Sequence, residues 1–212
     1  MAFIVFEGLD GAGKSSLIQN LQHKLDRNRI RYILTREPGG TPLAEQLREL
    51  LIWDGGDTPV ERTELLLYGA IRAQHVERKI KPALKDDYWV LCDRFTGSTY
   101  AFQKGGRGLK ADDIHWLNQY ATDGLEPDLN VLLDLPVEVS LKRMQERAQS
   151  SGVGKDRFEM EKSSFHQRVR DAYLELANEK PEKWLVLNAD QNREKILADF
   201  ASAMKERGLL SD

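Results

Sequence analysis

Residues 8–15 read GLDGAGKS and match the pattern G-x-x-x-x-G-K-[ST] at every fixed position. The apolar run 3–6 precedes them, and residues 16–27 follow with leucines at helical spacing. A buried strand, a glycine-rich turn and an amphipathic helix form the context in which this pattern binds phosphate. Glycines let backbone N–H groups approach an anion, and the helix N-terminus adds partial positive charge. The stretch therefore predicts a nucleoside triphosphate site.

Two side chains of this stretch have expected roles of their own. Lys14 would reach the β- and γ-phosphates, and the Ser15 hydroxyl would bind Mg²⁺. A glycine-rich loop that merely turns a strand into a helix is the alternative, and the flanking segments disfavour it. The predicted triphosphate-binding residues are Gly8, Leu9, Asp10, Gly11, Ala12, Gly13, Lys14, Ser15 and Ser16.

The composition is that of a globular protein with an ordinary core. The 212 residues are 41% hydrophobic and 31% charged, and the net charge is −3. This charge balance does not produce the positive electrostatic potential that attracts nucleic acid or an anionic membrane. Cys92 is the only cysteine, and no apolar run approaches the roughly 20 residues of a membrane span. Residues 1–3 lead straight into the first apolar run without a signal-peptide pattern, so we expect a cytoplasmic enzyme.

Short apolar runs alternate with helical patterns along the whole chain. This alternation predicts an α/β fold, in which right-handed crossovers build a parallel sheet covered by helices on both faces. We expect one domain, because no linker or repeat interrupts the pattern. The expected strands are 3–6, 32–34, 89–92, 129–133 and 185–187, and the expected helices are 16–27, 42–52, 59–83, 110–122, 136–148, 161–178 and 192–207. Thr58 and Pro59 are expected to start the helix 59–83.

Ligands of an open parallel sheet lie outside the carboxyl ends of its strands. Asp93 and Arg94 come directly after the third predicted strand. Asp93 is placed to hold Mg²⁺, and Arg94 to clamp a second phosphate. An internal ion pair between the two is the alternative reading. Residues 35–41 follow the second strand as a tight loop containing Arg36, Glu37 and Pro38, which suits an acceptor phosphate but also an ordinary turn.

Other candidate residues carry weaker signals. Tyr68 and Arg72 share one face of a predicted helix and could stack on a base and contact its edge, although such aromatics are usually core. Arg147, Lys155 and Arg157 flank the small-residue segment 148–154, which is typical either of a lid over a triphosphate or of a solvated loop. We interpret 104–108 as a loop near phosphate. Trp116, Trp184 and Phe200 are expected in the core.

A P-loop alone leaves switch GTPases, motor ATPases and small-molecule kinases open. The guanine motif N-K-x-D is absent from the sequence, since Asn188-Ala189-Asp190 lacks the lysine. The short chain, a second arginine-bearing edge and a lid-like segment favour transfer to a small phosphate ester such as a nucleoside monophosphate. A protein that binds nucleotide without transfer remains an alternative of another class.

Several motifs together resemble the thymidylate kinase family. They are the extended P-loop at residues 6–15, the loop 35–41, the sequence DRF at 93–95 with Ser98, Ala101 and Gln103, and the glycine-rich stretch 105–108. The resemblance runs from about residue 3 to about residue 200. It implies a single P-loop kinase domain over 1–212 with a lid at about 147–158. It also implies a three-layer fold with strand order 2-3-1-4-5, the reaction ATP + dTMP → ADP + dTDP, Mg²⁺ and a homodimer.

The resemblance also implies roles for individual residues. Asp10 contacts the acceptor sugar or orients Arg94, and Arg94 holds the acceptor phosphate with Arg36 and Arg48. At the base, Tyr68 stacks on thymine, Arg72 contacts its edge, and Ser98 and Gln103 read the pyrimidine. Phe102 crowds out a 2′-hydroxyl. The full expected dTMP site is Asp10, Arg36, Glu37, Pro38, Arg48, Tyr68, Arg72, Arg94, Ser98, Phe102 and Gln103.

Some positions depart from the family pattern. Gly11 stands where eukaryotic-type enzymes have a P-loop arginine, so the catalytic cation is expected from the lid, as in the bacterial type. Arg147, Lys155 and Arg157 all remain candidates, beside the catalytic Lys14, Asp10 and Arg94. Tyr68 replaces the usual phenylalanine, and Phe95 the frequent tyrosine or histidine. The runner-up among enzymes is a deoxynucleoside kinase or another nucleoside monophosphate kinase.

Overall fold

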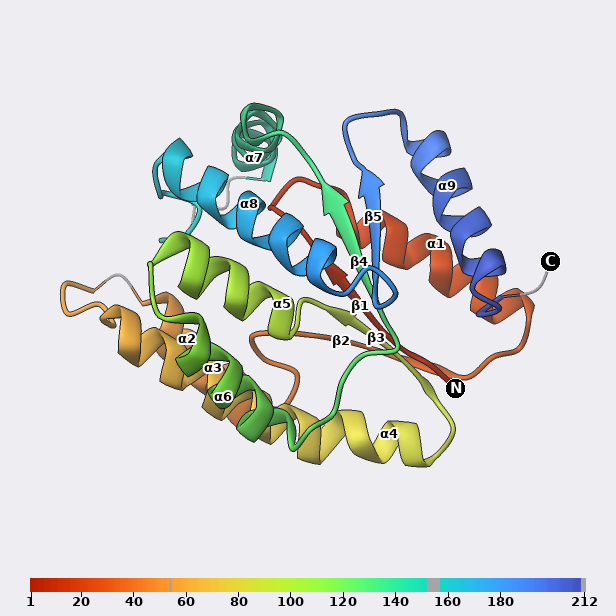
Figure 1. Ribbon diagram of the computed structural model, residues 1–212, viewed down its shortest axis with the longest axis horizontal. Coiled ribbons are helices and arrows are strands. Elements are labelled where there is room, and N and C mark those ends of the chain that lie inside the picture. The colour runs from red at the N-terminus through yellow and green to blue at the C-terminus, as the bar shows by residue number, and fades with distance from the viewer. Residues whose placement is uncertain (54, 152–156, 211–212) are drawn as a thin grey trace.

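The computed structural model describes residues 1–53, 55–151 and 157–210. Five strands form one parallel sheet in the order β2-β3-β1-β4-β5, which confirms the order that the resemblance implied. Helices flank both faces of this sheet (Figure 1). The strands are β1 (Phe3–Glu7), β2 (Tyr32–Arg36), β3 (Trp89–Asp93), β4 (Leu129–Asp134) and β5 (Trp184–Asn188).

The helical segments follow the predicted alternation with the strands. Within the described residues they are α1 (Lys14–Arg27), α2 (Pro42–Ile52), α3 (Glu61–His75), η1 (Val76–Ile80), α4 (Lys81–Lys85), α5 (Thr96–Thr99), η2 (Tyr100–Gly106), α6 (Ala111–Thr122), α7 (Val137–Ser151), α8 (Ser163–Glu179) and α9 (Arg193–Glu206). No described helix is both long enough and apolar enough to cross a bilayer.

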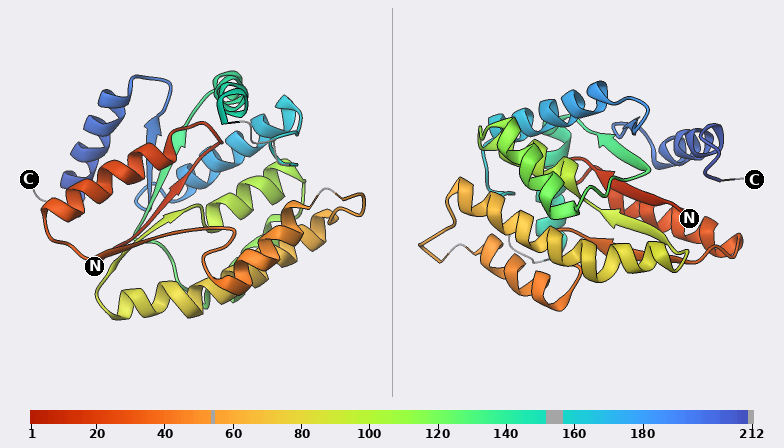
Figure 2. Two further views of the ribbon diagram at one scale, coloured as in Figure 1. Left: turned by 180° about the vertical axis from the view of Figure 1, so that it is seen from behind. Right: turned by 60° about the horizontal axis from the view of Figure 1, so that its bottom comes forward.

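Strand β1 is buried along its whole length and divides the core into two faces. Ile4 and Phe6 pack among residues of α1 and α9 on one face. Phe3 and Val5 point to the other face, where η1 and Phe95 cover them. This alternation is the period-2 pattern of a strand, and burial on both sides is typical of a central parallel strand. Figure 2 shows α1 and α9 together on one side of the sheet.

Helix α2 begins and ends where the sequence predicts. The Thr41 side chain accepts a hydrogen bond from the Ala44 N–H at 3.3 Å, and Pro42 occupies the first helical position. A hydroxyl cap followed by proline is a strong start signal, because proline lacks the N–H that the first turn leaves unpaired.

The prediction of one helix over 59–83 was wrong at its start and in its continuity. Helix α3 begins at Glu61, and its N-cap is Val60 rather than Thr58. The run then widens into the π-helical segment η1 before α4. Pro82 gives the physical reason, because it lacks an N–H and its ring crowds the carbonyl of Arg78 one turn earlier.

The segment predicted as a phosphate loop at 104–108 is instead mostly helical. Residues 100–106 form the π-helical segment η2, which packs along α8. A Cβ on Gly105 would lie 2.5 Å from the Arg168 carbonyl oxygen, and a Cβ on Gly106 would lie 2.5 Å from the Phe165 ring. These glycines therefore serve close helix packing, which depends on a neighbour far away in the sequence.

Trp184 and Phe200 lie in the core as predicted, but Trp116 does not. Trp116 is 66% exposed on α6 and stacks on Tyr120, with ring centroids 5.7 Å apart. The two residues are one turn apart, so they share the outer face of the helix.

Gly105→Ala should destabilise the protein by about 2 kcal/mol, because the added methyl overlaps the α8 backbone. At a helical glycine that faces open space, the same substitution to alanine would instead raise the free energy of unfolding by about 1 kcal/mol. Urea unfolding measures the difference. An unchanged or raised stability would show that η2 and α8 do not approach this closely.

Candidate active site

The P-loop joins β1 to α1 and has the backbone that its glycines permit. Gly8, Gly11 and Gly13 have φ values of 131°, 78° and 98°. A Cβ on Gly8 would lie 2.5 Å from the Leu133 carbonyl oxygen on β4, so only glycine fits there. The turn thus brings backbone N–H groups and the α1 N-terminus to the carboxyl edge of the sheet.

Lys14 folds back over the P-loop. Its Nζ donates to the carbonyl oxygens of Gly8 and Leu9, both at 3.1 Å, and lies 3.9 Å from Asp10. Burial lowers the pKa of Lys14, and the nearby positive charge of Arg94 lowers it further, while Asp10 opposes both effects. A phosphate group is the natural partner for this buried cation.

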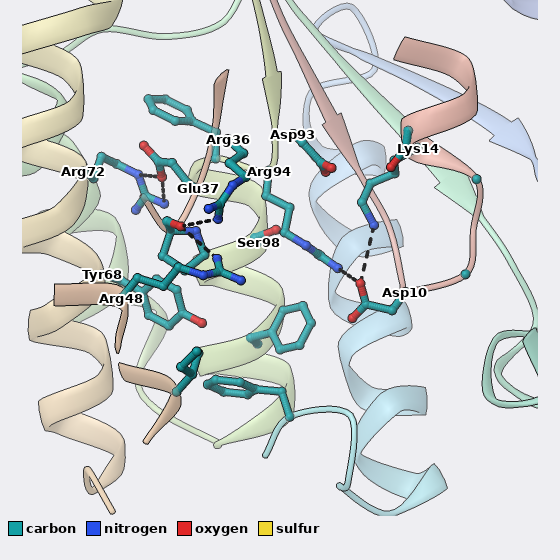
Figure 3. Close-up of a pocket in the computed structure, with 18 of the residues that line it drawn as sticks. Asp10, Lys14, Arg36, Glu37, Arg48, Tyr68, Arg72, Asp93, Arg94 and Ser98 are labelled. Carbon is teal, nitrogen blue, oxygen red and sulfur yellow. Dashed lines mark hydrogen bonds and ion pairs between the residues drawn. The ribbon is translucent and has the colours of Figure 1, made fainter. Parts of the chain in front are cut away.

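Asp10 receives two cations at once (Figure 3). Arg94 Nη2 donates to Asp10 Oδ1 at 2.9 Å, and Lys14 Nζ lies 3.9 Å from the same oxygen. Burial alone would raise the pKa of Asp10, but the charges of Arg94 and Lys14 hold it well below its usual range. Asp10 therefore stays ionised and neutralises the arginine.

Arg94 adopts an unusual backbone conformation at the end of β3. Its φ is 70°, and its N–H donates to the Phe6 carbonyl oxygen at 2.9 Å. Its Nη1 donates to Ser98 Oγ at 3.2 Å and to Tyr173 OH at 3.1 Å. Strain at a non-glycine residue is tolerated where surrounding contacts fix it, often at functional sites. The alternative of an Asp93–Arg94 pair is wrong, because this guanidinium pairs with Asp10.

A buried network follows β2. Glu37 Oε2 accepts from Arg72 Nε at 2.9 Å, and Glu37 Oε1 lies 2.9 Å from His75 Nδ1. His75 Nε2 in turn lies 2.7 Å from the Thr35 hydroxyl. The remaining arm of Arg72, Nη1, donates to Asn118 Oδ1 at 2.7 Å. This network fixes Arg72 in the wall of the cavity.

The bend at Pro38 gathers two further arginines. The Glu37–Pro38 peptide bond is cis, and the Pro38 carbonyl oxygen accepts from Arg36 Nη1 at 3.2 Å and from Arg48 Nη1 at 2.8 Å. Arg36 also pairs with Glu45 at 2.9 Å. Arg36 and Arg48 come from β2 and α2, so the loop after β2 brings both guanidinium groups to one place (Figure 3).

One cavity of about 440 Å³ brings most predicted residues together. It extends from the P-loop past Arg94 to the rings of Tyr68 and Phe102. Its lining comprises Asp10, Gly11, Gly13, Lys14, Ser15, Ser16, Arg36, Glu37, Pro38, Arg48, Ile52, Tyr68, Arg72, Asp93, Arg94, Phe95, Ser98, Phe102, Arg147 and Phe158. Gly8, Leu9 and Ala12 shape the P-loop without lining this cavity.

Gln103 lies elsewhere. It is completely buried, and its Nε2 is 3.4 Å from Glu64 Oε2 on α3. Ser98 does line the cavity, but its hydroxyl donates to Glu7 Oε2 at 2.6 Å. The structure therefore places both side chains against buried carboxylates.

The candidate Mg²⁺ ligands come from two elements, Ser15 from the first turn of α1 and Asp93 from the end of β3. Ser15 and Asp93 line the main cavity and also a neighbouring one beside α1 and β2. Asp93 Oδ1 is buried and has no hydrogen-bond partner among the described residues. A buried carboxylate oxygen without a partner fits a hard cation, for which oxygen ligands are preferred.

The three predicted lid cations have different surroundings. Arg147, at the end of α7, lines the cavity and pairs with Glu159. Arg157 Nε donates to the Leu51 carbonyl oxygen at 2.8 Å, and its Nη1 lies 3.3 Å from Glu64 Oε1, so it is bound to α2 and α3. Lys155 lies outside the described residues, as do residues 152–154 of the small-residue segment.

Sequence reasoning missed a smaller cavity of about 230 Å³ beside the P-loop. It lies between Gly13 and the segment after β5, where Gln191 and Arg193 line it. Arg143 of α7 forms its wall and donates to the Gly11 carbonyl oxygen at 3.0 Å. In the sequence, Arg143 is one arginine on a polar helix face, and this pattern does not indicate a binding site.

A family model described as thymidylate kinase matches residues 6–200. The chain belongs to the thymidylate kinase family. It is 47% identical over 210 residues to the thymidylate kinase of Bdellovibrio bacteriovorus, covering 99% of this chain and 98% of that protein. The thymidylate kinase of Geotalea daltonii is 50% identical over 192 residues, 90% of each chain. That of Pseudomonas putida is 47% identical over 198 residues, 93% of this chain and 92% of that protein.

Membership in the thymidylate kinase family confirms the resemblance, the fold and the enzyme class read from the sequence. The P-loop, Arg94 and the loop after β2 are the parts of the motif set that the structure gathers around one cavity.

The Asp10–Arg94 pair should make stability depend on pH. An aspartate whose pKa is lowered in the folded state stabilises the protein fully above its unfolded pKa of about 3.9, and this contribution is lost only as pH falls through the lower folded pKa. Asp10→Asn should therefore cost about 1–2 kcal/mol of unfolding free energy at pH 7 and somewhat less at pH 3, where only the unfolded chain has begun to bind the proton. Urea unfolding at both pH values measures this, with the exposed Asp57→Asn as control. An equal loss at both pH values would contradict the ionised pair.

Proposed function

We propose that these residues have separate roles in the reaction of the family, ATP + dTMP → ADP + dTDP. The family match and its relatives assign this phosphotransfer to the protein. The observation that carries the residue assignments is the position of Arg94. It lies between the P-loop end of the cavity, with Lys14, and the aromatic end, with Tyr68 (Figure 3).

The P-loop end binds the donor. The amides of residues 8–16 and the Lys14 ammonium hold the ATP phosphates, because backbone N–H groups at a helix N-terminus favour anions. The smaller cavity walled by Arg143 continues from this end and suits the base of the nucleotide. Donor phosphates therefore reach the main cavity from the side of α1.

Arg94 holds the acceptor phosphate, and Arg36 and Arg48 add positive charge from the loop after β2. An oxygen of the dTMP phosphate attacks the γ-phosphorus, and the bond to the β-phosphate oxygen of ATP breaks. The attacking oxygen is already nucleophilic, so orientation and charge stabilisation supply most of the rate. Asp10 keeps Arg94 in place while it does so.

The aromatic end binds thymine. Tyr68 and Phe102 offer ring surfaces, and Arg72 is held by Glu37 and Asn118 in the cavity wall. Phe102 limits the space beside the sugar. The contacts of Ser98 and Gln103 with Glu7 and Glu64 support indirect roles, in which they shape the pocket from behind.

Ser15 and Asp93 would hold Mg²⁺, which neutralises charge on the ATP phosphates when bound. The unpartnered, buried Asp93 oxygen supports this assignment. Among the lid cations, Arg147 is favoured as the group that reaches the transferring phosphoryl, because it lines the cavity and its charge already lowers the pKa of Asp10. Lys155 stays a second candidate.

We also infer that the protein works as a homodimer and that residues 1–212 form one kinase domain. Helices α3 and α6 pack together through Gly69 and Leu117 and expose large apolar side chains: Leu66 is 62%, Trp116 66% and Tyr120 74% exposed. A second copy covering this face would bury a stacked aromatic pair, the kind of anchor that dominates interfaces. The composition and the family are typical of a cytoplasmic enzyme.

The function is tested by ADP release from ATP–Mg²⁺ with dTMP, dUMP, UMP, dCMP, dGMP, AMP or thymidine. We expect dTMP to dominate. Lys14→Ala should lower its turnover about 10²–10³-fold, since one preorganised cation is lost, while Lys24→Ala on the same helix should not. If another monophosphate dominates, the base assignments are wrong; ATP binding without transfer would leave only a binding protein.

The dimer is tested by light scattering. We expect wild-type protein at about twice the 24.2 kDa chain mass and Tyr120→Glu at the chain mass, because a buried unpaired charge opposes association. Val186→Glu, an apolar-to-acid change on β5, serves as control. A Tyr120→Glu variant that stays dimeric would exclude this face as the interface.

A further inference from the structure

Beneath Arg94 lies a polar cluster that the proposed reaction does not use directly. Glu7, the last residue of β1, is completely buried. It accepts hydrogen bonds from the backbone N–H groups of Phe95 at 2.9 Å and Ser98 at 3.1 Å. These bonds tie the start of α5 to the end of β1, so the backbone that directly follows Arg94 is fixed.

The same carboxylate orients two hydroxyl groups. Glu7 Oε2 accepts from Ser98 Oγ at 2.6 Å and from Tyr173 OH at 3.0 Å, and the two hydroxyl oxygens lie 2.8 Å apart. Burial raises the pKa of the Tyr173 hydroxyl well above its usual value, so it keeps the hydrogen that it donates. With their hydrogens directed away, both oxygens present lone pairs to Arg94.

Arg94 donates hydrogen bonds to the lone pairs of both hydroxyl oxygens. Its Nη1 donates to Ser98 Oγ at 3.2 Å and to Tyr173 OH at 3.1 Å, while its Nη2 donates to Asp10. One nitrogen is thus directed by the hydroxyl pair and the other by the carboxylate. Because the guanidinium is planar, contacts at both nitrogens fix its orientation as well as its position.

Tyr173 differs from the other members of this cluster in its origin. It lies on α8, far from the P-loop in the sequence, and it is 1% exposed. It does not line the main cavity, whereas Arg94 does. Any effect of Tyr173 on the reaction must therefore pass through the residues that it contacts.

We propose that Tyr173 is a positioning residue, which with Glu7 sets the orientation of the Arg94 guanidinium toward the acceptor phosphate. The proposal rests on the proposed function, in which Arg94 holds that phosphate. It also makes α8 a structural part of the acceptor site, although none of the α8 residues lines the cavity.

The test is Tyr173→Phe, which removes one oxygen and keeps the ring. Loss of a hydrogen bond to a charged group should lower kcat/KM for dTMP about tenfold, while KM for ATP changes less than twofold. Tyr100→Phe is the matched control, because Tyr100 is also a buried tyrosine of the same core cluster but its hydroxyl reaches Glu175 instead. Equal kinetics in the two variants would overturn the proposal, as would equal losses for dTMP and ATP.

A second measurement does not depend on activity. The side-chain ¹⁵N–¹H resonances of Arg94, assigned by their loss in Arg94→Lys, should shift in Tyr173→Phe and stay unchanged in Tyr100→Phe. Unmoved resonances would overturn the positioning role even if turnover fell. If wild-type protein transferred nothing to dTMP while these resonances shifted as expected, the proposed function would fail and the positioning of Arg94 would stand.

Discussion

The ion pair between Arg94 and Asp10 is the contact on which the rest of the site depends. It joins the turn after β3 to the P-loop after β1, and these strands are neighbours in register, with Phe6 opposite Asp93. Because parallel strands end at the same edge, both loops meet there without any long side chain having to reach across the sheet. The left-handed backbone at Arg94 is the local consequence of aiming its side chain into that meeting point.

Charge balance explains how so many cations share one cavity before any phosphate is bound. Asp10 contacts both Lys14 and Arg94 and compensates one of their two charges, and Glu37 compensates the charge of Arg72. Each carboxylate also fixes the direction of its arginine, so little reorganisation is left for the moment of reaction. Glu7 belongs to the same scheme, since it orients the hydroxyls that face Arg94 without facing the cavity itself.

The sequence predicted what depends on local patterns. The P-loop, the bounds of α2 and the placement of Arg94 after a buried strand follow from motif spacing, capping residues and strand alternation. Features that depend on a distant neighbour were missed. The sequence predicted a loop at Gly105, but α8 packs closely against this glycine. It predicted Trp116 in the core, but the helix places this side chain on its exposed face. Tyr173 meets Glu7 across 166 residues, a separation that no local pattern encodes.

The ion-pair partner of Arg157 is another feature that the sequence does not predict. Its position beside a small-residue segment predicted a cation for the transferring phosphoryl, yet spacing cannot show which carboxylate a side chain will meet. Glu64 on α3 is 1% exposed and lies 3.0 Å from Arg107 and 3.3 Å from Arg157. A buried carboxylate needs such partners, because an unpaired charge in the interior costs several kcal/mol. Moving Arg157 toward a phosphate would weaken this cluster, whereas Arg147 pairs at an exposed position, where ion pairs are weak and easily exchanged.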